Sequence, residues 1–135
     1  MAAQIVGPQG VTILNPPAKE LLAKIGKIEV ADGTTGFAAF GIPSGAFIAG
    51  VYTISMGANA TQTVHAGFTN GGTELLNGFA PNSTGYAASG AQTGSAVGTQ
   101  VSGDKTVYLK ANVATLTNPV YVKVEYYLPQ SGQVF

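Results

Sequence analysis

The sequence contains no cysteine, no tryptophan and no arginine, and only 9% of its 135 residues are charged. Without cysteine the chain can form neither a disulfide framework nor a cysteine-ligated zinc site, and its fold depends on packing and hydrogen bonds. Six basic residues balance six acidic residues, so the net charge is zero. The basic patch that nucleic-acid binding requires is therefore missing, and we expect no nucleic-acid partner.

Targeting and membrane signals are also missing from the sequence. Residues 1–10 contain neither the basic nor the apolar region of a signal peptide, and no apolar run approaches the roughly 18–20 residues of a membrane span. We therefore expect a protein that is made in the cytoplasm and has no membrane partner.

Charged residues are confined almost entirely to the two ends of the sequence. With His65 counted as neutral, Glu74 is the only charged residue between Gly33 and Gly103. A protein that is free in solution normally carries net charge and spreads its charged residues over the surface. We infer that neighbouring subunits cover the uncharged middle and predict a homo-oligomer. The alternative is a small β-domain whose surface is hydrated by threonine, serine and asparagine.

The first 26 residues show two patterns. Residues 1–14 hold isolated apolar side chains between glycines and a proline, which favours an extended N-terminal arm. Asn15 is suited to cap a helix, Pro16 to occupy its first position and Gly26 to end it, so residues 15–26 are predicted to form one short helix. Because such a helix is marginally stable alone, it must pack on another part of the chain.

Residues 27–128 have the pattern of an all-β domain. Strands are predicted at residues 27–30, 37–42, 46–56, 63–69, 73–77, 107–113 and 120–128. The longest, 46–56, would place Ile48 and Tyr52 on one face and Val51 on the other. The last two are expected to form a hairpin, with Lys110 near Glu125. About seven or eight strands and one short helix predict a β-sandwich or jelly roll, followed by a C-terminal tail over residues 129–135.

A stretch of small and polar residues, 81–103, interrupts this pattern. It is longer than the usual loop of a compact domain, and such long loops are commonly functional or disordered. The sequence leaves three interpretations open, namely a flexible linker, a functional loop and glycine-rich strands that pair with a neighbour.

The sequence shows no constellation of residues typical of catalysis or metal binding. His65 is the only histidine, and no G-x-S-x-G motif surrounds any serine. A triad of serine, His65 and either Asp32 or Asp104 has no local support, and the acidic residues lie on different predicted elements. We expect no enzyme activity and no catalytic, cofactor-binding or metal site, with an unrecognised hydrolase as the least favoured alternative. His65 is interpreted as a polar residue on a strand face or at a subunit contact.

Tyrosines are the residues best suited to recognition. Tyr86 lies in the small-residue stretch, and Tyr108, Tyr121 and Tyr127 are expected on the outward face of the last hairpin. Aromatic side chains on a sheet face suit either sugar stacking or a protein interface. We favour an interface because no matching set of acidic or amide residues near them would orient a sugar.

Three stretches carry a resemblance to a known class of proteins. They are a glycine- and proline-bounded start of a long uncharged strand, 42–51, the small-residue run 81–103, and the closing strands 106–109 and 120–126. From Gly41 onward the sequence resembles the small β-rich virion proteins of tailed bacteriophages, of the capsid decoration or cement type. The first forty residues do not share this likeness.

The resemblance implies a function and a set of partners. It implies a homo-oligomer, with a trimer favoured, that binds the major capsid protein or other virion proteins and stabilises the assembled head lattice. The protein would be made in the host cytoplasm and located in the virion. A receptor- or carbohydrate-binding module of a tail fibre or spike is the alternative.

Overall fold

The computed structural model describes residues 4–6, 12–14, 20–87 and 94–128. Within them the backbone forms ten β-strands and one short 3-10 helix, η1, which confirms the all-β prediction. The elements are β1 (Gln4–Val6), β2 (Thr12–Leu14), β3 (Leu21–Ile28), η1 (Val30–Asp32), β4 (Phe37–Ile42), β5 (Phe47–Ser55), β6 (Thr63–Gly67), β7 (Leu76–Phe79), β8 (Gly85–Ala87), β9 (Lys105–Asn112) and β10 (Val120–Tyr127).

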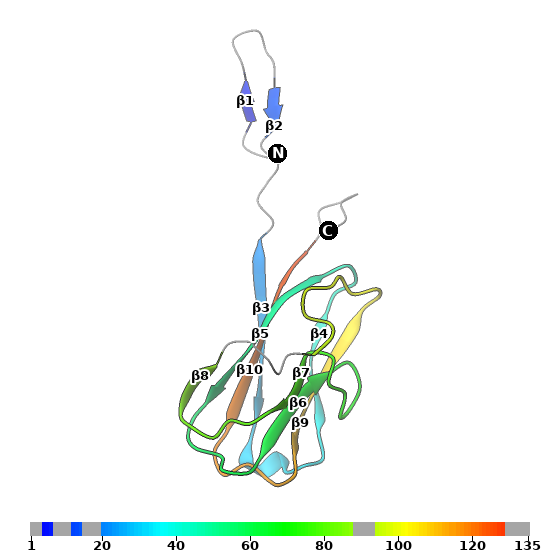
Figure 1. The fold of residues 1–135 in the computed structure, drawn as a ribbon. Coiled ribbons are helices and arrows are strands. Elements are labelled where there is room, and N and C mark those ends of the chain that lie inside the picture. The colour runs from blue at the N-terminus through cyan, green and yellow to red at the C-terminus, as the bar shows by residue number, and fades with distance from the viewer. Residues whose placement is uncertain (1–3, 7–11, 15–19, 88–93, 129–135) are drawn as a thin grey trace.

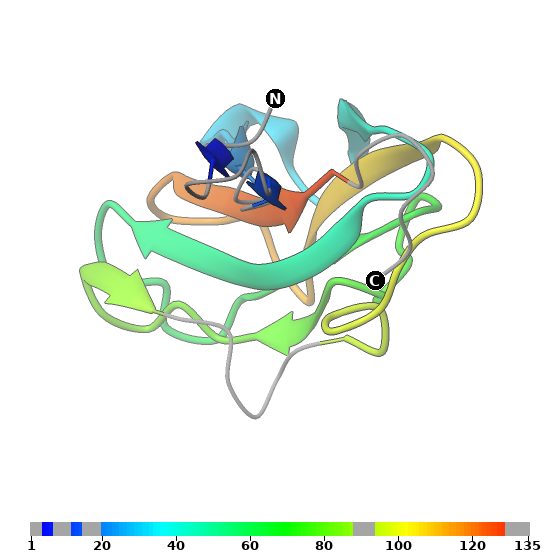
Figure 2. The same ribbon diagram turned by 90° about the horizontal axis from the view of Figure 1, so that it is seen from above.

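Eight of the strands form two four-stranded antiparallel sheets that face each other (Figure 1, Figure 2). Sheet I has the strand order β3-β10-β5-β8, and sheet II has the order β4-β9-β6-β7. The remaining strands, β1 and β2, pair as a hairpin that lies beyond the end of the sandwich at which β3 begins (Figure 1). The predicted β-sandwich is therefore confirmed, and β3 extends it to Leu21.

The core lies between the sheets and follows the two-residue period of the strands. In β10, Val120, Val122 and Val124 are fully buried and alternate with half-buried polar and aromatic residues. In sheet II, Val107 and Leu109 of β9 repeat this pattern. Because burying one such side chain stabilises the fold by about 1.5–3 kcal/mol, the alternation decides which side of each strand faces inward.

The helix predicted over residues 15–26 is wrong where the structure describes it, because Leu21–Ile28 is strand β3. All eight residues of β3 pair with β10. Helix propensities are small, and pairing with a long neighbouring strand overrides them. Residues 15–19 of the predicted helix lie outside the described residues.

Gly26, which was expected to end that helix, marks a close approach of the two sheets instead. A Cβ atom at this position would lie 2.6 Å from Leu109 Cδ1 and 3.0 Å from the Cβ atom of Ala39. Neither contact leaves room for a side chain in a well-packed core. The glycine therefore lets β3 of sheet I pack against sheet II.

The two ends of the chain were predicted as an arm and a tail. The arm, residues 1–14, contains β1 and β2, which pair antiparallel with Gln4 opposite Leu14. The other residues of the arm and the whole tail, 129–135, lie outside the described residues. These two boundaries remain predictions.

The two closing strands exist as predicted, but the hairpin that was expected to join them is wrong. β9 pairs with β4 and β6 in sheet II, whereas β10 pairs with β3 and β5 in sheet I. Lys110 consequently lies opposite His65, and Glu125 forms its ion pair with Lys123 at 3.2 Å. Alternation shows which side of a strand is buried but does not choose the strand's partners, and both strands have the same alternation.

A β-bulge changes the exposed side of β5. Ile48 and Val51 are both fully buried, although three positions separate them. The pairing with β10 shifts between Glu125 and Tyr126, which leaves Ala49 as the extra, exposed residue. The prediction that Ile48 shares a face with Tyr52 is therefore wrong, because a bulge moves the residues on its two sides to opposite parity.

The described parts of the 81–103 stretch pair within the chain. β8 adds a short edge strand to sheet I, with Tyr86 opposite Ile54. Farther along, the Ile48 N–H donates to the Thr99 carbonyl at 2.9 Å, and the Val101 N–H donates to the Ala46 carbonyl at 2.8 Å. Of the three interpretations, strand-like pairing fits these parts, and its partner is the same chain.

Candidate interaction surface

The outer side of sheet I gathers exposed and half-buried aromatic and aliphatic side chains from four strands. The pairing register places a common set of residues on this side, and we call them the aromatic face. They are Leu21, Ala23, Ile25 and Lys27 of β3, Tyr121, Lys123, Glu125 and Tyr127 of β10, Tyr52 and Ile54 of β5, and Tyr86 of β8.

Two tyrosines and an ion pair form the first cluster of the aromatic face. The rings of Tyr52 and Tyr86 stack with their centroids 5.5 Å apart. Lys123 Nζ lies 4.9 Å from the centre of the Tyr52 ring and 3.2 Å from a carboxylate oxygen of Glu125. Burial, followed by a hydrogen bond to Glu125, raises the pKa of Tyr52 above its ordinary value. The cluster holds one cation and one anion, so its charges cancel.

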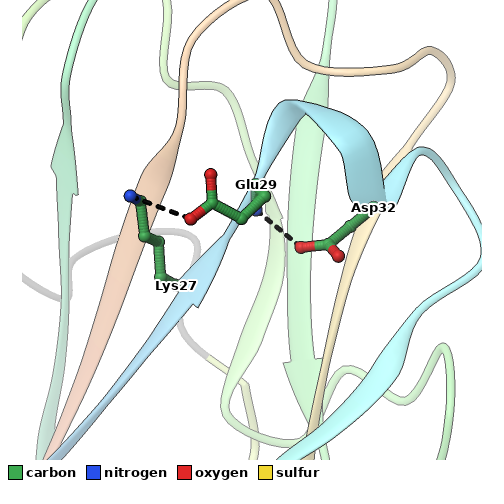
Figure 3. Close-up of polar contacts among 3 residues, drawn as sticks. All are labelled: Lys27, Glu29 and Asp32. Atoms are coloured by element: carbon green, nitrogen blue, oxygen red, sulfur yellow. Dashed lines mark hydrogen bonds and ion pairs between the residues drawn. The ribbon is translucent and has the colours of Figure 1, made fainter.

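A second cluster surrounds Lys27 at the end of β3 (Figure 3). Lys27 Nζ lies 2.9 Å from a carboxylate oxygen of Glu29 and 5.4 Å from the centre of the Tyr121 ring. The hydrogen bond to Glu29 raises the pKa of Lys27. The Glu29 N–H donates to Asp32 Oδ2 at 2.6 Å, which ties the end of β3 to η1. Here too the lysine is neutralised by an acid on the same chain.

Large apolar side chains of the aromatic face are open to solvent. Leu21 is 46% exposed, Ile25 57% and Tyr86 60%. Isolated exposed apolar residues are common in soluble proteins, but these lie on one sheet face together with further half-buried tyrosines. Enrichment in tyrosine with few uncompensated charges is typical of the centre of a protein interface. The aromatic face is therefore suited to pack against another protein.

The predicted tyrosines are divided between the two sheets. Tyr86, Tyr121 and Tyr127 lie on the aromatic face, whereas Tyr108 belongs to β9 of sheet II, where it lies opposite Gly67. The expectation that Tyr108, Tyr121 and Tyr127 share one face is therefore wrong, for the same reason as the hairpin. Tyr52 was missed as a member of this face because the bulge in β5 has no signal in the sequence.

His65 lies on a strand face, which confirms the first of its two interpretations. It belongs to β6, opposite Lys110, and its Nδ1 atom accepts a hydrogen bond from the Gly78 N–H at 3.0 Å. Burial, followed by the positive charge of Lys110, lowers the pKa of His65 below its ordinary value. This hydrogen bond fastens β7 to β6 and requires a neutral imidazole.

The aspartates considered for a triad have other partners. Asp32 accepts the Glu29 N–H, and Asp104 accepts the Ser44 N–H at 2.9 Å. In the part of the chain that the structure describes, no group of three or more histidine, aspartate or glutamate side chains could hold a metal ion. No helix in the same part is long and apolar enough to span a membrane.

Comparison with known proteins finds a shared fold in solved structures and no match by sequence. No protein-family model and no curated protein matches the sequence. A chain in the capsid asymmetric unit of cyanophage Pam1 superposes with a TM-score of 0.56 and 21% identity, over 91% of this chain and 97% of that one. The chain shares its fold with chains of phage capsids.

Two further phage capsids contain chains with this fold. In the acidic stable capsid of the Helicobacter pylori bacteriophage KHP30, the TM-score is 0.53 and the identity 17%, over 83% of this chain and 94% of the other. In the capsid of Ralstonia phage GP4 the TM-score is 0.56 and the identity 14%, over 85% and 89%. At these identities the likeness concerns the fold.

Proposed function

We propose that this protein is a structural protein of a tailed-phage virion, a capsid decoration or cement subunit that binds and stabilises the assembled head lattice. The observation that carries the proposal is the fold shared over nearly the full length of both chains with a chain of the cyanophage Pam1 capsid. Since the match covers 91% of one chain and 97% of the other, the two chains have about the same length. The proposal therefore concerns a small capsid component.

The aromatic face supports a binding role for such a component. A subunit that bridges its neighbours needs a broad surface that can be buried without leaving unpaired charge. On the aromatic face, Lys123 is paired with Glu125 and Lys27 with Glu29, while Ile25 and Tyr86 remain open to solvent. We propose that this face packs against the lattice proteins, of which the major capsid protein is the principal partner.

Stabilisation of the shell would follow from mass action. A subunit that binds the assembled lattice but not free capsid protein shifts the equilibrium towards the assembled state, by about 2.7 kcal/mol per site when its free concentration is 100 times Kd. A homo-oligomer, with a trimer favoured, would join several lattice subunits at once and gain affinity through multivalency. The protein would be made in the host cytoplasm and enter the virion after the shell forms.

The proposal is tested with particles that lack the protein. We expect such particles to release their DNA at a lower temperature than complete particles, and added wild-type protein to restore the release temperature of complete particles. Ile25→Asp, which puts a charge on the aromatic face, should fail to restore it, whereas Asn77→Asp, at an exposed position of β7 in sheet II, should restore it fully.

Three results would count against cementing. The first is equal heat resistance with and without the protein. The second is equal restoration by Ile25→Asp and Asn77→Asp, which would remove the aromatic face from the proposal. The third is loss of adsorption to the host with unchanged heat resistance, which would favour the alternative of a receptor- or carbohydrate-binding module.

A further inference from the structure

We propose that the outer edge of β3, together with the pocket beside it, is the docking site for an extended, carboxylate-bearing segment of a shell protein. This inference rests on the proposed function, because it names the contact through which the subunit would hold its lattice. Three observations support it. The outer edge of β3 has no strand partner among the described residues, a pocket lies beside this edge, and two lysines of the pocket, Lys24 and Lys105, form no ion pair in the described part of the chain.

β3 is an edge strand over its whole length. It pairs with β10 through eight residues, and its other side has no strand partner among the described residues. An edge of this kind presents a row of free backbone N–H and C=O groups on which an extended segment can form a further strand. With Leu21 and Ile25 exposed beside it, the edge is continuous with the aromatic face.

An open pocket of about 370 Å³ lies next to this edge, where β3 of sheet I approaches β4 of sheet II. Its lining joins residues from both sheets, namely Lys24 of β3, Gly41 and Ile42 of β4, Pro43, Asp104, and Lys105 and Thr106 of β9. A segment added to the edge of β3 would therefore pass the mouth of the pocket and could place one side chain in it.

Two lysines occupy positions in this pocket that the strand pattern assigns to the core. Lys24 lies opposite the fully buried Val124, and Lys105 lies opposite the buried Ile42. In the described part of the chain neither lysine forms an ion pair, unlike Lys27 and Lys123. Lys105 Nζ lies 5.8 Å from the centre of the Phe68 ring, a contact that leaves its charge uncompensated.

The pocket holds one acidic group of its own, and that group has a structural role. Asp104 Oδ1 accepts the Ser44 N–H at 2.9 Å and so holds the turn between β4 and β5. With two ammonium groups and one carboxylate, the pocket keeps an excess positive charge. Charge complementarity therefore selects an anionic side chain as its occupant.

An inward lysine on an edge strand also excludes unsuitable partners. Pairing with an apolar strand would bury the Lys24 ammonium without an acid, which is unfavourable. In a two-fold pairing of two β3 edges centred on Lys24, the two ammonium groups would lie opposite each other. A strand with an aspartate or glutamate opposite Lys24 avoids both penalties, and this favours a different protein over a second copy.

The test uses the full-length protein and shells purified without it. Sedimentation of the shells measures binding of wild-type protein, Lys24→Glu, Lys24→Arg and the control Lys110→Glu, which makes the same charge change on β9 opposite His65. We expect Lys24→Glu to weaken binding by at least about tenfold, and Lys24→Arg and Lys110→Glu to change it by less than about twofold. Thermal unfolding of each variant verifies that it is folded.

Hydrogen exchange then locates the contact. On binding to shells, amides of Leu21–Ile28 that face away from β10 should exchange more slowly. Two results would overturn the inference and leave the proposed function standing. One is that wild-type protein binds shells with no change in the exchange of these amides. The other is that Lys24→Glu binds shells as tightly as wild-type protein does. Protection of β3 that rises with protein concentration in the absence of shells would overturn it in favour of a second copy.

A peptide pair makes the inference independent of the shell. The peptide acetyl-Thr-Val-Thr-Glu-Val-Thr-Val-amide should slow exchange in β3, and its counterpart with glutamine in place of glutamate should not. If wild-type protein fails to bind shells but responds to the glutamate peptide alone, the proposed function is wrong and the docking site stands. If neither shells nor the glutamate peptide protects β3, both are wrong.

Discussion

The outer faces of the two sheets differ, although their inner faces are built alike. Sheet I turns Tyr52, Tyr86 and Ile25 outward, and its two outward lysines, Lys27 and Lys123, are held in ion pairs. Sheet II turns outward mainly polar residues of β6 and β9, among them His65 and Lys110, and no ion pair joins them in the described residues. A polar face can remain in water, whereas an apolar, charge-compensated face loses little on burial. The difference favours the outer side of sheet I as the surface for the proposed contacts with other proteins.

Two connections that cross between the sheets, β5 to β6 and β9 to β10, are held together by Asn59. It is fully buried in the connection between β5 and β6. Its Oδ1 accepts the Thr117 and Asn118 N–H groups, both at 2.8 Å, and its Nδ2 donates to Ser55 Oγ at 3.2 Å. It thus ties that connection to the one between β9 and β10.

The largest expected effect on stability is that of Asn59→Ala. The variant removes the acceptor of two partly buried backbone N–H groups, so we expect a loss of about 1–3 kcal/mol in the free energy of unfolding, measured by urea denaturation. The control is Asn77→Ala, an exposed asparagine of β7, which should change stability by less than about 0.5 kcal/mol. Equal stability of the two variants would show that the connections are not held through Asn59.

A matched pair of tyrosine variants sharpens the comparison of the faces. Tyr86→Ala removes an exposed ring from the aromatic face, and Tyr108→Ala removes a ring from the outer side of sheet II. We expect Tyr86→Ala to weaken binding to shells by about 2 kcal/mol, because buried tyrosines are frequent hot spots, and Tyr108→Ala to have little effect. Sedimentation with purified shells measures both. The reverse order would assign the interface to sheet II.

Val113 offers a smaller, stabilising change in the connection from sheet II to sheet I. It is a β-branched residue with φ of 77° and is 71% exposed, so it bears backbone strain and contributes little burial. Asparagine tolerates this conformation better. We expect Val113→Asn to raise the free energy of unfolding by about 0.5–1 kcal/mol in urea, and Val113→Ala to gain less. A loss of stability in Val113→Asn would mean that the valine side chain has a packing role.

Alternation made the strands predictable but not their neighbours. β4 has the predicted bounds, and β9 and β10 differ from theirs by one or two residues. Their assignment to opposite sheets depends on contacts far apart in the sequence, which period-two patterns do not encode. β3 was mistaken for a helix because alanine, leucine and lysine favour helices locally, while its pairing with β10 is a long-range effect.

The same limits apply to the candidate surfaces. The sequence alone could name Tyr86, Tyr121 and Tyr127 as candidates, because tyrosine is suited to protein interfaces whichever strand carries it. Tyr52 could not be assigned to the face, since a bulge decides which way it points. The pocket position of Lys24 was hidden for a different reason, because an inward lysine can be recognised only once β3 is known to be a strand.

The last expected effect concerns pH and the outer side of sheet II. Burial and Lys110 lower the pKa of His65 in the folded protein below its unfolded value of about 6.5. The unfolded chain therefore binds a proton first as the pH falls, so the stability contributed by the neutral imidazole is complete above about pH 6.5 and is lost as the pH falls through the folded-state pKa. Protonation also removes the acceptor of the Gly78 N–H.

Because one hydrogen bond on a half-exposed strand contributes less than about 1.5 kcal/mol, the loss between pH 7.5 and pH 5 should stay below that value. Urea denaturation at the two pH values measures it. In His65→Gln the difference should shrink to the part due to carboxylates. Lys110→Gln should give an intermediate difference, because it removes one of the two causes of the lowered pKa. An unchanged pH dependence in His65→Gln would mean that another group is responsible. In that case the hydrogen bond from Gly78 to His65, which joins β7 to β6, would make no pH-dependent contribution to stability.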